Sequence, residues 1–135
     1  MVQDNDESKI VKLNKKKLKE YIQEMKEKSL IIEIDGKIIN QWNDYIQKIG
    51  DMLNFPEEDK YPNRDGYLDW MRDLDWIPFN RLLLIINNYK YFMKDNIKDK
   101  RDFIEMMTII LKFWNKNWYQ KNACYKKQLI ILLVD

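Results

Sequence analysis

Three aspartates in residues 54–76 lie one helical turn apart. Asp65, Asp69 and Asp73 are spaced i, i+4 and i+8, which places them on one face of a helix. Like charges at this spacing cost roughly 0.2–0.5 kcal/mol per pair, so helix stability does not favour them. Carboxylates in this arrangement could exchange protons with a substrate, hold Mg²⁺, or pair with the cations of a partner protein.

The segment around these aspartates is acidic and aromatic. Seven acidic and three basic residues give residues 54–76 a charge of −4, although the whole chain carries +2. Tyr61, Tyr67, Trp70 and Trp76 lie among these charges. Exposed aromatic rings among carboxylates, on a helix and its preceding loop, favour a surface that binds a basic, concave partner. The alternative is a solvated helix face whose tryptophans pack inside.

Missing residue types exclude several kinds of catalytic and metal site. The 135-residue chain has no histidine and a single cysteine, Cys124, which excludes Ser-His-Asp and Cys-His catalysis, histidine-ligated metals and an internal disulfide. Its three glycines lie too far apart for a phosphate loop. We therefore expect no enzymatic activity, no metal and no cofactor. The enzymatic alternative is a carboxylate pair, Asp65 and Asp69, in acid–base or Mg²⁺ chemistry.

Composition also bears on partners and location. The near balance of 24 basic and 22 acidic residues argues against a nucleic-acid binder. No apolar run approaches the ~18 residues of a membrane span, and the polar start of the chain does not resemble a signal peptide. We expect a cytoplasmic protein that binds neither nucleic acid nor membrane and is a monomer when free.

Three short apolar runs, residues 30–34, 82–86 and 129–134, predict the strands that position the acidic segment. Each is rich in isoleucine and leucine with little alternation, as is typical of strands buried on both faces of a parallel sheet. Between them, helical spacing predicts the crossovers that parallel pairing requires. The sequence thus predicts a small three-layer α/β domain over residues 29–135, with a three-stranded parallel sheet.

The first 28 residues are predicted to be a charged, largely helical extension. Within residues 9–28, Leu18, Tyr21, Ile22 and Met25 follow the i, i+3, i+4, i+7 spacing of an amphipathic helix. We expect this helix to dock on the domain through that apolar stripe.

The acidic segment is predicted to form a helix that starts after Asn63. Asn63 can cap it, and Tyr67, Met71 and Leu74 give it a buried edge. Another group of acids begins a later predicted helix, whose dipole is a sufficient explanation for them: Asp99, Asp102 and Glu105.

The acidic segment resembles the barstar family, the intracellular protein inhibitors of barnase-type ribonucleases. The matching residues are Phe55-Pro56, the pattern Asn63-x-Asp65-x-x-x-Asp69, and Asp73-Leu74 shortly before the central predicted strand. The family's opening, a strand that runs into Asp/Asn-Gly and an apolar pair, is similar to residues 34–39. The similarity in element order covers roughly residues 30–135, and residues 54–76 are its motif-like part.

The sequence departs from the family pattern around the expected contact. Tyr61-Pro62 fills the stretch where the family usually has a glycine, and Leu68 stands where a tryptophan is common. Arg64 places a cation inside the acidic segment. Because these differences bear on the partner, a barstar-like protein that binds a different nuclease or toxin is the alternative hypothesis.

The resemblance implies inhibition by occlusion of a cationic active-site cleft. It implies that Asp69 enters the phosphate subsite, that Asp65 pairs with a second cation at the rim, and that Asn63 fixes the loop. The partner-binding residues on this basis are Asp59, Tyr61, Asn63, Asp65, Leu68, Asp69 and Asp73. The expected partner is a ribonuclease or a related toxin protein.

Overall fold

The computed structural model describes residues 7–117 and 127–135; Cys124 lies outside them. Its helices and strands are β1 (Lys9–Leu13), α1 (Lys15–Met25), β2 (Ser29–Asp35), α2 (Trp42–Met52), α3 (Arg64–Met71), β3 (Arg81–Asn87), α4 (Ile97–Asn117) and β4 (Gln128–Val134). Three short 3-10 turns complete the list: η1 (Gly36–Ile38), η2 (Glu57–Asp59) and η3 (Tyr89–Tyr91). No helix among the described residues is long and apolar enough to cross a membrane.

Four parallel strands form one sheet in the order β1-β4-β3-β2. The three predicted strands correspond to β2, β3 and β4, and their parallel pairing is confirmed. The predicted number of strands is wrong, because residues 9–13 form a fourth strand at the edge of the sheet. The predicted α/β class with helical crossovers is confirmed.

The predicted N-terminal helix begins at Lys15 rather than at residue 9. Residues 9–13 contain only three apolar side chains among lysines, a pattern too short to distinguish a strand from a helical turn. Their pairing with β4, where Lys9 lies opposite Ile130, supplies the backbone hydrogen bonds that make them a strand. The domain boundary at residue 28 stays a prediction.

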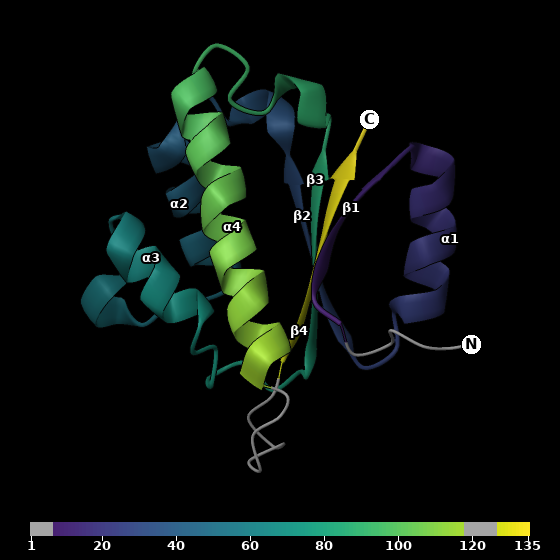
Figure 1. The fold of residues 1–135 in the computed structure, drawn as a ribbon, viewed down its shortest axis with the longest axis horizontal. Helices are drawn as coiled ribbons and strands as arrows, with labels where there is room; N and C mark the ends of the chain where they lie inside the picture. The colour runs from purple at the N-terminus through teal and green to yellow at the C-terminus, as the bar shows by residue number, and fades with distance from the viewer. Residues whose placement is uncertain (1–6, 118–126) are drawn as a thin grey trace.

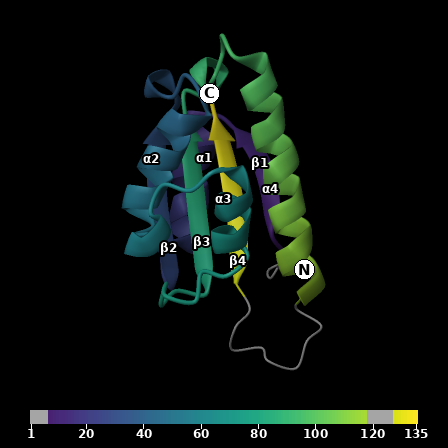
Figure 2. The same ribbon diagram turned by 90° about the vertical axis from the view of Figure 1, so that its left-hand side faces the viewer.

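The sheet is the middle layer of three, as Figures 1 and 2 show. Helices α2, α3 and α4 lie on one face, and α1 lies on the other. On the α1 side, Leu18 joins a buried cluster with Leu83 and Ile85 of β3 and with Ile130 and Leu132 of β4. Because both faces of β3 and β4 are buried, their apolar residues do not alternate with polar ones.

Replacing Leu18 by alanine should destabilise the fold, because this side chain is 8% exposed and anchors α1 to the sheet. We expect the free energy of unfolding to fall by about 2–4 kcal/mol, measured by urea denaturation. Lys19→Ala, at an exposed neighbouring position, should change it by less than about 0.5 kcal/mol. An equally small effect of Leu18→Ala would contradict the packing of α1 on the sheet.

Candidate partner-binding surface

Helix α3 carries the acidic segment, and Asn63 caps its start as predicted. The Asn63 side-chain oxygen accepts a hydrogen bond from the Gly66 N–H at 2.9 Å, which satisfies one of the donors left open at the start of a helix. The predicted buried edge is confirmed, since Tyr67, Met71 and Leu74 are at most 1% exposed. The opposite side of α3 is therefore the side available to a partner.

Asp73 does not share the helix face of Asp65 and Asp69, which corrects the predicted row of three carboxylates. Helix α3 ends before Asp73. The next residue, Leu74, has a left-handed backbone with φ of 53°, which turns the chain, and its side chain is buried. Asp73 accepts a hydrogen bond from the Asp75 N–H at 3.3 Å. Partial burial, and then the charge of Asp75, raise the pKa of Asp73.

A buried pair of tyrosines fixes α3 to the rest of the domain. The hydroxyl oxygens of Tyr45 and Tyr67 lie 2.6 Å apart, and the Tyr67 hydroxyl donates to the Met107 sulfur at 3.2 Å. Burial raises the pKa of both hydroxyls, so they keep their protons and act as donors. These contacts link α3 to α2 and α4 from below the exposed surface.

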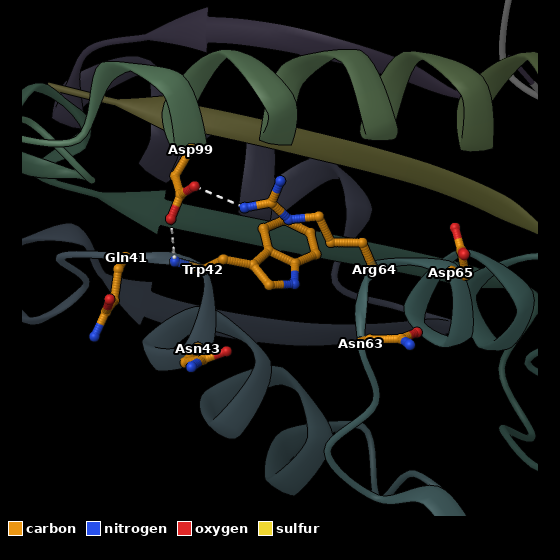
Figure 3. Close-up of a pocket in the computed structure, with 7 residues that line it drawn as sticks. All are labelled: Gln41, Trp42, Asn43, Asn63, Arg64, Asp65 and Asp99. Carbon is orange, nitrogen blue, oxygen red and sulfur yellow. Dashed lines mark hydrogen bonds and ion pairs between the residues drawn. The ribbon is translucent and has the colours of Figure 1, made fainter.

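Arg64, the cation that the sequence places within the acidic segment, bonds to α4 instead (Figure 3). Its guanidinium donates to Asp99 and to Asp102, both at 2.6 Å, and its central carbon lies 5.2 Å from the ring centroid of Trp42. The other Asp99 oxygen accepts the backbone N–H of Trp42 at 2.9 Å. Asp99 thus connects the first turns of α2, α3 and α4.

The roles of Asp99 and Asp102 were missed by the sequence analysis. The helix dipole explains an acid in the first turn of α4, but it does not reveal the ion pairs with Arg64, which is 35 residues from Asp99. A hydrogen bond from Lys98, together with the charges of Lys98 and Arg64, lowers the pKa of Asp102. No local pattern identifies this contact, because it exists only after α3 and α4 pack together.

Asp65 and Asp69 both face solvent, one turn apart on α3. Asp65 is exposed and forms no hydrogen bond or ion pair with any residue that the structure describes. Asp69 accepts a hydrogen bond from Arg72 at 2.9 Å, and its side chain is still 73% exposed. Exposed pairs of this kind contribute about 0–1 kcal/mol, so an incoming cation can replace Arg72.

The loop before α3 packs on the end of α2 through Tyr61. The Tyr61 hydroxyl donates to Asp51 at 2.6 Å, and the ring lies against Gly50, where an added Cβ would clash with the carbonyl oxygen of Lys60. Tyr61 is nevertheless 54% exposed, and the hydrogen bond with Asp51 raises its pKa. The loop is therefore held in place while it presents an aromatic ring to solvent.

The other aromatic residues of the acidic segment fit the alternative in which tryptophans pack inside. Trp70 donates to the carbonyl of Asp59 at 3.0 Å, and Trp76 donates to the carbonyl of Leu53 at 2.8 Å. The two indole rings, both half-buried, meet edge-on with centroids 5.4 Å apart. Tyr67 and Phe55 are buried, so Tyr61 is the one exposed aromatic residue of this segment.

The predicted contact residues lie on η2, on the loop after it, on α3 and just beyond the end of α3. Six are exposed and Leu68 is half-buried; the exposed ones are Asp59, Tyr61, Asn63, Asp65, Asp69 and Asp73. We call these seven residues the acidic surface. Among the residues that the structure describes, no three His, Cys, Asp or Glu side chains form a group that could hold a metal ion.

A polar hollow of about 500 Å³ adjoins the acidic surface, where the first turns of α2, α3 and α4 meet (Figure 3). Its lining residues are Gln41, Trp42, Asn43, Asn63, Arg64, Asp65 and Asp99. Asn63 and Asp65 belong both to this hollow and to the acidic surface. A partner seated on α3 would therefore also reach the start of α2.

Comparison with known proteins identifies one family. The family model described as barstar (barnase inhibitor) matches residues 30–128. No curated protein and no solved structure matches the chain significantly.

Replacing Arg64 by glutamine should destabilise the protein, because Asp99 then loses its charged donor and Asp102 keeps only Lys98. Hydrogen bonds to charged groups contribute about 1.5–3 kcal/mol, and we expect a loss in that range in urea denaturation at neutral pH. Arg72→Gln, which breaks the exposed pair with Asp69, should cost less than about 1 kcal/mol. Equal losses for the two variants would show that Arg64 has no special role.

Arg64→Gln should also change how stability depends on acid pH. The pKa of Asp102 is below its ordinary value of 3.8 in the folded protein, so Asp102 stabilises the fold above that value. This contribution is lost as the pH falls through the folded pKa. Because Arg64 is one cause of the low pKa, the variant should lose less stability than the wild type between about pH 5 and about pH 2.

Proposed function

The chain belongs to the barstar family of barnase inhibitors, and on this basis we propose that it is a protein inhibitor of a barnase-like ribonuclease. It blocks the cationic active-site cleft with α3 and the loop before it. One observation carries the proposal: Asp65 and Asp69 face solvent side by side, while the neighbouring cation, Arg64, is bound to α4.

The chemistry of a ribonuclease active site explains why carboxylates can block it. Such a site binds the phosphates of RNA, so cationic side chains line its cleft. A carboxylate accepts charge-assisted hydrogen bonds from arginine as a phosphate does. In this proposal Asp69 enters the phosphate subsite, where arginines replace its contact with Arg72, and Asp65 pairs with a second cation at the rim.

The rigidity of α3 supports this role. Binding costs free energy when flexible side chains and loops become ordered, and a preorganised surface reduces that cost. Here the Asn63 cap, the buried Tyr67 hydroxyl and the Arg64 ion pairs hold α3 before any partner arrives. The two carboxylates are thus presented at a fixed spacing.

The remaining residues of the acidic surface surround the two carboxylates. Asn63 fixes the loop, and the exposed ring of Tyr61 and the half-buried Leu68 make apolar contacts with the partner. Asp59 and Asp73 add negative charge at the rim. Residues 54–76, which include this surface, carry a charge of −4. This charge also attracts a basic partner from a distance, and the attraction weakens as the salt concentration rises.

The inhibitor is needed in the cell that makes the ribonuclease. A ribonuclease that is exported must be neutralised before it leaves, so its inhibitor acts in the cytoplasm. The inhibitor needs no metal, cofactor or catalytic residue of its own, because occlusion alone stops the enzyme. It acts as a monomer that binds one partner.

A different nuclease or toxin as the target is the second candidate, and the Tyr61-Pro62 loop favours it. Where the family usually has a glycine close to the partner, this chain presents an aromatic ring fixed by Asp51. A ring at this position changes the shape that the loop presents to a barnase-like partner. Affinity capture with the wild-type protein and with Tyr61→Gly tests this: recovery of a partner without ribonuclease activity would favour the second candidate.

Asp69→Asn should weaken the binding of a barnase-type ribonuclease. Truncation of one member of a buried, hydrogen-bonded charge pair costs about 2–5 kcal/mol, so we expect the Kd to rise from about thirtyfold to a few thousandfold. Calorimetry measures the Kd, and a ribonuclease assay measures the loss of inhibition. The stability of the fold should change little, because the Asp69 side chain is 73% exposed.

Glu33→Gln is the matched control, since it removes one negative charge from an exposed position on β2, outside the acidic surface. It should leave the Kd within about twofold of the wild-type value. An unchanged Kd for Asp69→Asn, with the wild-type protein binding the ribonuclease, would reject the role of Asp69. No binding by the wild-type protein would reject the barnase-like target.

A further inference from the structure

The carboxyl ends of the four parallel strands meet at one edge of the sheet, at the top of Figure 1. In open parallel sheets, ligands bind outside this edge, at the point where successive helices pass to opposite faces. Here α1 follows β1 on one face and α4 follows β3 on the other, with β4 between the two strands. The place where this fold favours a ligand is thus beside the end of β4, on another part of the molecule from α3.

A hollow of about 330 Å³ lies at this point. Residues at the ends of β1 and β4 and in η3, which follows β3, line it, namely Lys12, Leu13, Asn14, Tyr89, Leu133 and Asp135. Leu13 and Leu133 give it an apolar part, and Asn14 begins α1 by accepting the Lys17 N–H at 2.8 Å. The hollow is therefore part apolar and part charged.

Two lysines bring positive charge to the hollow without forming ion pairs among the described residues. Lys12 is exposed on the wall of the hollow. Lys100 contacts Tyr89, another lining residue, with its ammonium 3.3 Å from the Tyr89 carbonyl oxygen and 4.4 Å from the Tyr89 ring centroid. Burial, and in smaller part the charge of Lys12, lower the pKa of Lys100, while the charge of Asp135 raises it. Lys12, Lys100 and Asp135 thus bring two positive charges and one negative charge to this end of the sheet.

The neighbouring surface is positive as well. The ammonium groups of Lys37, Lys90 and Lys94 each lie 5.4 Å from the ring centroid of Tyr91. Of the acids at this edge, Asp35 accepts from Asn88 and from the Lys37 backbone, while Asp135 lines the hollow and accepts the Lys90 N–H at 2.9 Å. An anionic ligand would relieve the repulsion among these cations.

We propose that the hollow beside the end of β4 binds the phosphate monoester group of a small ligand. The ammonium groups of Lys12 and Lys100 pair with the phosphate oxygens, and Leu13 and Leu133 contact the rest of the ligand. A phosphate monoester fits because it carries nearly two negative charges and three strong acceptor oxygens, enough for both lysines. This site shares no residue with the acidic surface and does not depend on the proposed function.

The test is calorimetric titration of the full chain with inorganic phosphate and with AMP, and adenosine as the uncharged comparison. We expect saturable binding of AMP with a Kd of about 1 mM or lower, weaker binding of phosphate alone, and no binding of adenosine. Lys12→Gln and Lys100→Gln should each weaken AMP binding about tenfold. Asp135→Asn should strengthen it severalfold, because the amide removes a repelling charge and still accepts the Lys90 N–H.

Lys48→Gln is the matched control, because it removes one lysine charge from an exposed position on α2. It should leave AMP binding unchanged. The proposal is overturned if the wild-type protein shows no saturation by about 10 mM AMP, or if Lys48→Gln weakens binding as much as Lys100→Gln does. Asp135→Asn distinguishes an effect on binding from loss of folding, because an unfolded variant could not bind AMP more tightly than the wild type does.

Discussion

The ion pairs of Arg64 with Asp99 and Asp102 are the constraint on which the acidic surface depends. They hold the first turn of α3 against α4, and Asp99 at the same time accepts the first N–H of α2. They also keep the charge of Arg64 on the α4 side of the helix, while Asp65 stays exposed. One side chain, Arg64, thus helps to hold α3 in place and leaves the carboxylates of this surface without its charge.

The two sides of α3 contribute differently to the stability of the fold. Its inner side is held by buried contacts, of which the pair of hydroxyls on Tyr45 and Tyr67 is the most enclosed. Its outer side carries Asp65 and Asp69, whose mutual repulsion costs only a few tenths of a kcal/mol. Burial on the inner side easily exceeds that cost. The helix can therefore present unfavourable charges without losing its fold, as a binding surface requires.

Helices must cover both faces of the sheet, because β3 and β4 are apolar on both faces. Helices α2, α3 and α4 cover one face, and α1 covers the other. The region that matches the family model begins at residue 30, after α1 and β1. Yet α1 is the helix that covers the second face, where Leu83, Ile85 and Ile130 are fully buried. Every residue of β4 is buried, so this strand would expose an apolar face to water without α1.

The sequence by itself determined the features that depend on neighbours in the chain. Apolar runs predicted β2, β3 and β4, helical periodicity predicted the buried edge of α3, and residue type predicted the Asn63 cap, because these signals lie within one element. Only the tertiary structure decided which way Arg64 points and whether residues 9–13 form a strand. Those outcomes rest on contacts between residues far apart in the chain, which become possible only when the layers have packed.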